Sequence, residues 1–279
     1  MKQLFFLFIL CVFVSCENDE VSYSSEYLKE LAPKMKNTIQ IIAHGGASAY
    51  EPFNSIRSFK KAFELESDGI ELDLMNTKDD SLMVFHDLNT KKNTGADYNM
   101  VDTEAAVLRS LNIGKGEKIP YLSEVFKILP PGKKIYLEVK WYQVLTAKNN
   151  TRLIDKLVDQ IEKSGRINDC IVVCFDIDYL LKIKEKKPEL KLYWNTMDPS
   201  TVNMISDWLF IRNLNGCDVQ SSLINYELAQ KLKERNQMLF AWTINDEKLA
   251  IELYQKYKVN GIFTDKPDFI RGSLGIFFK

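Results

Sequence analysis

Short apolar segments alternate with segments of helical periodicity along almost the whole chain. Such alternation predicts parallel βα units, because two parallel strands need a crossover connection that a helix usually supplies. The predicted strands are Ile39–His44, Ile70–Met75, Leu82–Phe85, Lys134–Lys140, Cys170–Cys174, Leu190–Asn195, Asp218–Ser221, Met238–Thr243 and Gly261–Asp265. Eight of these strands in parallel, with one more returning through a hairpin, predict a (β/α)8 TIM barrel.

An inserted loop after the third strand, Leu88–Lys118, interrupts the alternation. A long irregular connection near a site is typical of a lid or a specificity loop. An open doubly wound sheet is the alternative fold, but the chain carries no glycine-rich phosphate-binding motif to support it. The roughly 260 residues that follow a leader also suit a barrel of typical size.

The N-terminus has the composition of an export signal. A short basic start precedes an unbroken apolar run, Leu4–Val14, which is too short to span a bilayer but suits a signal-peptide core. The run ends at Ser15-Cys16, which resembles the lipidation site of bacterial lipoproteins. We expect residues 1–15 to be a lipoprotein signal peptide, 16–37 a tether and 38–279 the barrel domain. This predicts an exported protein, lipid-anchored through Cys16 to a bacterial membrane on its periplasmic or outer face. An ordinary cleaved secretory signal is the alternative.

Charge and cysteine content argue against several classes of protein. The formal net charge is -1, so the composition favours no nucleic-acid partner. Beyond the leader and its lipidation site the cysteines are Cys170, Cys174 and Cys217. An odd number argues against a disulfide framework, and no histidine lies near the first two to complete a zinc site. We therefore expect Cys170 and Cys174 to pack in the core.

One predicted hairpin gathers acidic side chains and a histidine. Glu71 and Asp73 share one face of its first strand, since side chains alternate along a strand. A tip at Asp79-Asp80 pairs Asp73 with His86 across the hairpin. A solvated polar face on an ordinary edge hairpin is the alternative.

The chain has two histidines, His44 and His86, and both stand at the ends of predicted strands. Barrels and open α/β sheets place their chemistry at strand ends, so a functional site is favoured over two structural histidines. Two imidazoles can act as a general acid and a general base on opposite sides of a reacting group.

Three acids lie near strand ends or on strand faces: Glu71, Asp73 and Glu138. Their hard oxygen donors suit calcium or magnesium better than zinc or copper. Lys140 shares a strand face with Glu138, and a divalent cation beside a lysine would stabilise charge developing on phosphate oxygens. These residues favour phosphodiester cleavage. A zinc hydrolase would leave no general acid or base, and a carboxylate-pair glycosidase would give the histidines no role.

Nine short motifs, in order, resemble the glycerophosphodiester phosphodiesterase family, a group of (β/α)8 barrels. The resemblance runs from about Ile39 to Pro267. The motifs are His44-Gly-Gly, Pro52-Phe-Asn-Ser, Gly69-Ile-Glu-Leu-Asp-Leu, Thr77-Lys-Asp, His86-Asp, Pro120-Tyr-Leu-Ser-Glu, Glu138-Val-Lys, Ala241-Trp-Thr-Ile-Asn and Thr264-Asp-Lys-Pro.

The resemblance implies metal-dependent hydrolysis of a glycerophosphodiester to an alcohol and glycerol 3-phosphate. The substrate's own adjacent hydroxyl would attack phosphorus, giving a cyclic phosphate that water then opens. The implied cofactor is one divalent cation, Ca²⁺ or Mg²⁺, and the implied partner is a small phosphodiester. The implied site residues are His44 and His86 as acid and base, Glu71, Asp73 and Glu138 as metal ligands, Lys140 as a phosphate contact and Trp242 as a wall against glycerol.

Two positions depart from the family pattern. Gly45 stands where the family has arginine, and Phe53 stands where it has glutamate. The joint absence of a cation and an anion fits the loss of an interacting pair, and it removes a bidentate phosphate contact. Glu51 is a speculative partial substitute for the missing acid. The alternatives are a catalytically impaired barrel acting as a surface-tethered binding lipoprotein, and a phosphodiesterase or lysophospholipase D acting on a different phosphodiester.

Overall fold

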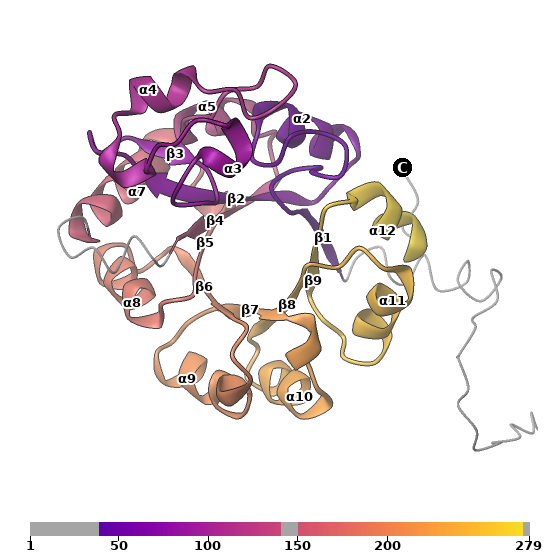
Figure 1. Cartoon of the computed structure of the whole chain (residues 1–279). Helices are drawn as coiled ribbons and strands as arrows, with labels where there is room; N and C mark the ends of the chain where they lie inside the picture. The colour runs from indigo at the N-terminus through magenta and orange to yellow at the C-terminus, as the bar shows by residue number, and fades with distance from the viewer. Residues whose placement is uncertain (1–38, 141–149, 276–279) are drawn as a thin grey trace, which may run out of the picture.

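The computed structural model describes residues 39–140 and 150–275 (Figure 1). The predicted signal peptide, the lipidation site at Cys16 and the tether lie outside the described residues.

Within that part of the chain, eight parallel strands close into a barrel with the helices outside it (Figure 1). The strand order is β1-β9-β8-β7-β6-β5-β4-β2, and pairing of β1 with β2 closes the ring. These strands are β1 (Gln40–Ala43), β2 (Gly69–Asn76), β4 (Lys134–Val139), β5 (Cys170–Cys174), β6 (Lys191–Thr196), β7 (Gly216–Gln220), β8 (Met238–Trp242) and β9 (Gly261–Thr264). The predicted (β/α)8 barrel is confirmed.

Helices connect successive strands around the outside. They are α2 (Ile56–Glu64), α5 (Leu122–Ile128), α7 (Asn150–Ser164), α8 (Ile177–Lys186), α9 (Ile205–Ile211), α10 (Tyr226–Glu234), α11 (Glu247–Gln255) and α12 (Pro267–Ser273). Asp176, Asn225 and Asp246 each cap a helix by accepting a hydrogen bond from the backbone N–H three residues later. These caps fix where the helices begin above the strand ends. No helix in the described ranges is both long and apolar enough to cross a membrane.

A further strand, β3 (Leu82–Val84), pairs antiparallel with β2 outside the ring. The N–H of Phe85 donates to the carbonyl of Asp73 at 3.0 Å, so these two residues lie opposite each other. The prediction that Asp73 pairs with His86 is therefore wrong by one residue. The cause is the turn at residues 77–81, in which the N–H of Thr77 donates to the carbonyl of Ser81. This turn is centred on one residue, Asp79, whereas the predicted turn is centred on two.

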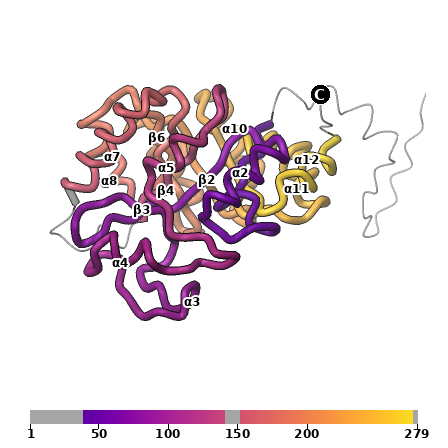
Figure 2. Tube along the Cα trace, turned by 90° about the horizontal axis from the view of Figure 1, so that it is seen from above, coloured from indigo at the N-terminus to yellow at the C-terminus, as the bar shows by residue number. Residues whose placement is uncertain are grey.

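The segment between β3 and α5 contains two short helices, α3 (Lys91–Thr94) and α4 (Ala105–Ser110), and stands out from the barrel in Figure 2. An apolar cluster of its own joins it to the hairpin. The buried members of this cluster are Met75, Met83, Phe85, Met100, Ala105, Leu108 and Ile119. Because hairpin and insertion share this core, the residue between them, His86, is held from both sides.

Apolar side chains fill the interior of the barrel. They are Ile42, Tyr136, Ile171, Val173, Tyr193, Phe240 and Phe263. The ring of Phe240 contacts the rings of Tyr136 and Phe263, with centroids 5.4 and 5.7 Å away. Gly261 leaves room for that ring, since a Cβ there would lie 2.0 Å from a Phe240 ring carbon. This apolar layer forms a floor below the polar side chains of the same strands.

The three cysteines beyond the lipidation site, Cys170, Cys174 and Cys217, are buried as free thiols. All three pack in the larger apolar core between the barrel and its helices. The expected core position of Cys170 and Cys174 is confirmed.

Replacing Gly261 by alanine should destabilise the barrel. The added methyl group would collide with Phe240, and overpacking of this kind costs about 1–3 kcal/mol. We expect a lower melting temperature and a lower urea midpoint. Gly272→Ala in α12 is the matched control, because no described atom lies within 4 Å of its Cβ position and alanine favours a helix. Equal stability of the two variants would contradict this account of the floor.

Candidate active site

A cavity of about 350 Å³ opens above the apolar floor. Both histidines line it, together with Glu71, Glu138, Lys140 and Trp242. The seventh predicted site residue, Asp73, lies beside it as part of the acidic cluster. One cavity therefore brings together side chains from β1, β2, β4 and β8 and from the start of the insertion.

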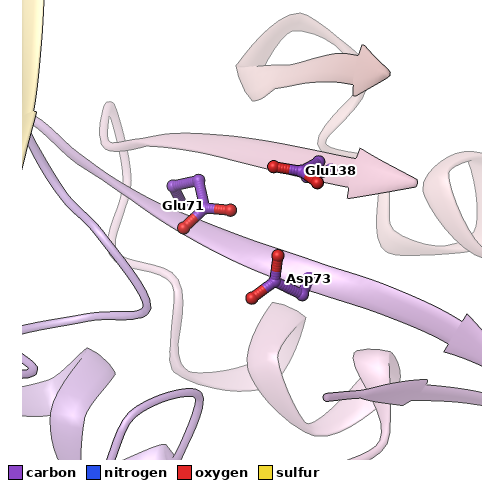
Figure 3. Close-up of side chains that lie close together, drawn as sticks. All are labelled: Glu71, Asp73 and Glu138. Carbon is purple, nitrogen blue, oxygen red and sulfur yellow. The ribbon is translucent and has the colours of Figure 1, made fainter. Parts of the chain in front are cut away.

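The acidic cluster consists of Glu71 and Asp73 from β2 and Glu138 from β4 (Figure 3). The register between the two strands sets Asp73 directly beside Glu138. One carboxylate oxygen from each residue lies within 4.8 Å of the others. All three side chains are buried, so their charges are poorly screened by water.

Among the described residues, one ammonium group faces this cluster. Lys140 Nζ lies 2.6 Å from Asp73 Oδ1 and 2.5 Å from Glu138 Oε1. Burial alone would raise the pKa of Asp73, but Lys140 and His86 hold it below its usual value. Burial, followed by the charge of Asp73, raises the pKa of Glu71 to about 8. If all three carboxylates were ionised, the cluster would carry more negative charge than Lys140 neutralises, and the raised pKa of Glu71 reflects that excess.

The residues fit a divalent cation. Their donors are hard carboxylate oxygens, which calcium and magnesium prefer. Glu71 Oε1 is buried and has no hydrogen-bond partner among the described residues. A cation at this position would satisfy that oxygen and balance the excess charge.

Neighbouring donors hold the other oxygens in place. The N–H of Gly45 donates to Glu71 Oε2 at 2.9 Å, and Asn54 Nδ2 donates to Asp73 Oδ2 at 2.6 Å. Asn54 has a positive φ of 59°, which turns its side chain toward Asp73, while Ser55 caps the following helix.

Each histidine is oriented by a carboxylate. His44 Nδ1 lies 2.8 Å from Asp265 Oδ1, and His86 Nδ1 lies 2.8 Å from Asp87 Oδ1. A carboxylate that accepts from Nδ1–H fixes the orientation of the ring and the tautomer of its neutral form. Burial alone would lower the pKa of His44, but its hydrogen bond to Asp265 and the charges of Glu71 and Asp73 raise it to about 9.

Asp265 is more than the strand-end turn residue that its position after the last strand suggests. It accepts hydrogen bonds from His44, from Ser48 Oγ at 3.0 Å and from Asn245 Nδ2 at 2.6 Å. Burial raises the pKa of Asp265, but these hydrogen bonds, that from His44 first, hold it below its usual value. The position of Asp265, a polar residue at the carboxyl end of a barrel strand, is the feature of the sequence that could have indicated a role in the site.

Phe53 packs between the two histidines. Its ring meets His44 edge-to-face with centroids 5.0 Å apart, and His86 at 6.2 Å. A Cβ on Gly45 would lie 2.3 Å from a carbon of this ring, so no larger residue fits there while Phe53 keeps its position. The two departures from the family pattern are therefore coupled by shape.

Glu51 does not replace the missing glutamate in the cavity. Its carboxylate pairs with Arg57 at 3.0 Å and with Lys115 at 3.1 Å. These interactions connect the β1–α2 loop to α2 and to the insertion, away from the residues that line the cavity.

Two polar residues of the cavity were not predicted from the sequence. Asn195 on β6 and Asp218 on β7 are paired in the parallel register and buried, with exposed fractions of 5% and 2%. Burial, followed by the charges of Glu138 and Glu71, raises the pKa of Asp218 well above its ordinary value. Neither residue belongs to a motif that the sequence alone would reveal.

Comparison with known proteins agrees with this geometry. Residues 44–269 match the sequence model of the glycerophosphoryl diester phosphodiesterase family. A glycerophosphodiester phosphodiesterase of Caldanaerobacter subterraneus is 31% identical over 243 residues, which cover 82% of this chain and 94% of that protein. A human lysophospholipase D is 24% identical over 282 residues, with 84% and 85% of the two chains covered.

A solved structure shares the barrel. It is a phosphodiesterase of Oleispira antarctica in complex with the product sn-glycerol-3-phosphate, with a TM-score of 0.78, 23% identity and coverage of 87% of this chain and 98% of that one. The family match spans nearly all of the barrel, including both histidines, the acidic cluster, Lys140 and Trp242. The chain therefore belongs to the glycerophosphoryl diester phosphodiesterase family and is a phosphoric diester hydrolase.

Proposed function

We propose that the protein hydrolyses glycerophosphodiesters to an alcohol and glycerol 3-phosphate with two histidines as acid and base. The observation that carries this is the placement of two carboxylate-oriented imidazoles and three buried carboxylates around one cavity. Membership of the family supports the substrate class.

Glu71, Asp73 and Glu138 would hold one divalent cation, Ca²⁺ or Mg²⁺. When bound, such an ion stabilises negative charge that develops on phosphate oxygens. Asn54 and the N–H of Gly45 keep the carboxylates oriented toward one another. Lys140 contacts two of the carboxylates and lines the cavity, from where its ammonium can also reach a phosphate oxygen.

His44 and His86 would move the protons. One imidazole takes the proton of the substrate hydroxyl next to the phosphate as that oxygen attacks phosphorus, and the other protonates the oxygen of the departing alcohol. The product is a cyclic phosphate. Water then opens the ring while the two imidazoles exchange roles, which yields glycerol 3-phosphate. Asp265 and Asp87 keep each ring in the tautomer that presents Nε2.

Trp242 would form the wall against the glyceryl part of the substrate. Its ring lines the cavity and meets Phe175 edge-to-face with centroids 6.0 Å apart. An aromatic wall of this kind excludes water and offers an apolar face to the carbon chain of glycerol.

The pair Gly45 and Phe53 favours a change in recognition of the phosphodiester. An apolar ring occupies the space beside both histidines, where a bidentate cation would otherwise contact phosphate. A different phosphodiester, including a lysophospholipid, is therefore the second candidate substrate. The human relative named a lysophospholipase D supports this choice.

We also propose export and lipid anchoring through Cys16. The apolar run that precedes Ser15-Cys16 supports a lipoprotein signal, and the polar residues after it support a tether. The barrel would then act on phosphodiesters at a membrane surface, on its periplasmic or outer side.

Alanine at His44 or His86 should abolish metal-dependent hydrolysis. Loss of a general acid or base typically lowers kcat by about 10²–10⁴-fold, with a smaller change in KM. Release of choline or ethanolamine from glycerophosphocholine and glycerophosphoethanolamine, with calcium, magnesium or chelator, measures this. Unchanged melting temperatures would show that the variants remain folded. If the wild type binds metal but hydrolyses none of the diesters, the alternative of a catalytically impaired, surface-tethered binding lipoprotein would be favoured instead.

Gly45→Ala should destabilise the protein, and Phe53→Ala should relieve the effect. A methyl group at position 45 collides with the ring, so we expect a loss of about 1–3 kcal/mol that shrinks when the ring is removed. Gly95→Ala is the matched control, because Gly95 also has a positive φ but no described atom lies within 4 Å of its Cβ position. A double-mutant cycle of urea midpoints measures the coupling, and purely additive effects would refute it.

Cys16→Ser should weaken attachment of the protein to the membrane. Without the thiol there is no site for lipidation, so the variant lacks the acyl chains that anchor a lipoprotein in the bilayer. Fractionation of expressing cells, with mass spectrometry of the mature N-terminus, measures this. An unmodified Cys16 in the wild type, or a mature N-terminus elsewhere, would instead support an ordinary secretory signal.

A further inference from the structure

Three unpartnered polar atoms gather on one wall of the cavity. Asn195 Oδ1, Asp218 Oδ1 and Trp242 Nε1 are all buried, and none has a hydrogen-bond partner among the described residues. All three side chains line the same cavity. The one other unpartnered atom of a cavity-lining side chain, Glu71 Oε1, belongs to the acidic cluster on the opposite strands.

The three side chains come from consecutive strands, β6, β7 and β8. Asn195 and Asp218 are direct neighbours in the parallel register, which places side chains on the same face about 5 Å apart. Phe240 on β8 is the register neighbour of Asp218, and Trp242 lies two residues further along β8. The set therefore forms one polar patch, with the amide and the carboxyl side by side and the indole N–H nearer the opening.

Burial of these atoms has a cost that the folded chain does not recover. A buried polar group without a partner costs about 1–3 kcal/mol. An apolar residue would fill the place of Asp218 without that penalty, since its register neighbour Phe240 belongs to the apolar floor. Three such groups on one wall point to a ligand that supplies their hydrogen bonds.

The chemistry of the patch selects the ligand. Asn195 Oδ1 and Asp218 Oδ1 offer acceptor oxygens, whereas Trp242 Nε1 can only donate. A hydroxyl group both donates and accepts, so the terminal hydroxyl of a glyceryl chain can donate to the two neighbouring oxygens and accept from the indole N–H, while the hydroxyl next to the phosphate keeps its proton for the imidazole. An ammonium group only donates and would leave the indole N–H without a partner, and a phosphate oxygen only accepts and would leave Asn195 Oδ1 without a partner.

We propose that Asn195, Asp218 and Trp242 form a hydroxyl-binding subsite that binds the terminal hydroxyl of the glyceryl part of the substrate. The proposal rests on the proposed function for the identity of the phosphate ester. The phosphate group lies toward the histidines and the acidic cluster, and the glyceryl chain extends across the cavity to β6, β7 and β8. Asn195 links the two regions, since its Nδ2 donates to Glu138 Oε2 at 3.4 Å.

A matched set of phosphate monoesters tests the subsite by binding alone. Glycerol 3-phosphate carries two hydroxyls, propyl phosphate carries the same carbon chain without them, and 3-aminopropyl phosphate carries a cation in their place. Calorimetric titration of each into calcium-saturated protein gives its Kd. We expect glycerol 3-phosphate to bind most tightly.

Asp218→Leu is the decisive variant. Loss of one or two hydrogen bonds should weaken glycerol 3-phosphate by about 5- to 30-fold and propyl phosphate by less than about 2-fold. Asp218→Asn, which keeps hydrogen-bonding atoms, should recover much of the affinity. Asp178→Asn, on the exposed first turn of α8, is the control and should change neither Kd. Asn195 is not the first choice, because its contact with Glu138 would disturb the acidic cluster as well.

Stability separates this role from a structural one. Because Asp218→Leu removes an unpartnered buried group, the ligand-free variant should melt at the same temperature as the wild type or higher. Equal loss of affinity for all three esters, tighter binding of the aminopropyl ester, or no change in any Kd would overturn the proposal. If the wild type hydrolyses glycerophosphodiesters but ligand binding does not depend on Asp218, the subsite is wrong and the proposed function stands. If binding of glycerol 3-phosphate depends on Asp218 but no diester is hydrolysed, the subsite stands and the proposed function is wrong.

Discussion

The site depends on a charge imbalance: among the described residues, three buried carboxylates share one lysine ammonium. Charges held in a barrel interior attract and repel more strongly than charges in water, so each must be held by a partner. The chain supplies Lys140 for two of the three acids and backbone or amide donors for the remaining oxygens. The excess charge and the free oxygen of Glu71 make a divalent cation the group that completes the arrangement.

The two histidines meet at the cavity by different structural routes. His44 follows β1 directly and is fixed by Asp265 at the end of the neighbouring strand β9. His86 stands where the hairpin passes into the insertion, and the shared apolar cluster of those two segments holds its backbone. Between the histidines, the Phe53 ring fills the space that a side chain at position 45 would need. Gly45 and Phe53 are therefore a pair related by shape.

The opposite wall of the cavity carries buried polar residues of its own. A (β/α)8 barrel can change its substrate by altering inward-facing residues near the strand ends without disturbing the core outside the strands. Asn195 and Asp218 are such residues, placed above the apolar floor formed by Tyr193 and Phe240. Their unsatisfied atoms lower stability slightly in the free protein and are available to a ligand that carries hydroxyls.

The sequence by itself determined the barrel, the two histidines and the acidic cluster, because strand alternation and strand-end position are local properties that the residue order records. It did not determine the hairpin register, since a turn centred on one residue instead of two shifts every pairing by one. Only the tertiary structure showed that Asp265 orients His44 across 221 residues of chain and that Gly45 and Phe53 exclude each other. The role of Asp218 also needed the closed barrel, because a single acid in an apolar strand has no meaning until the strands around it define the cavity.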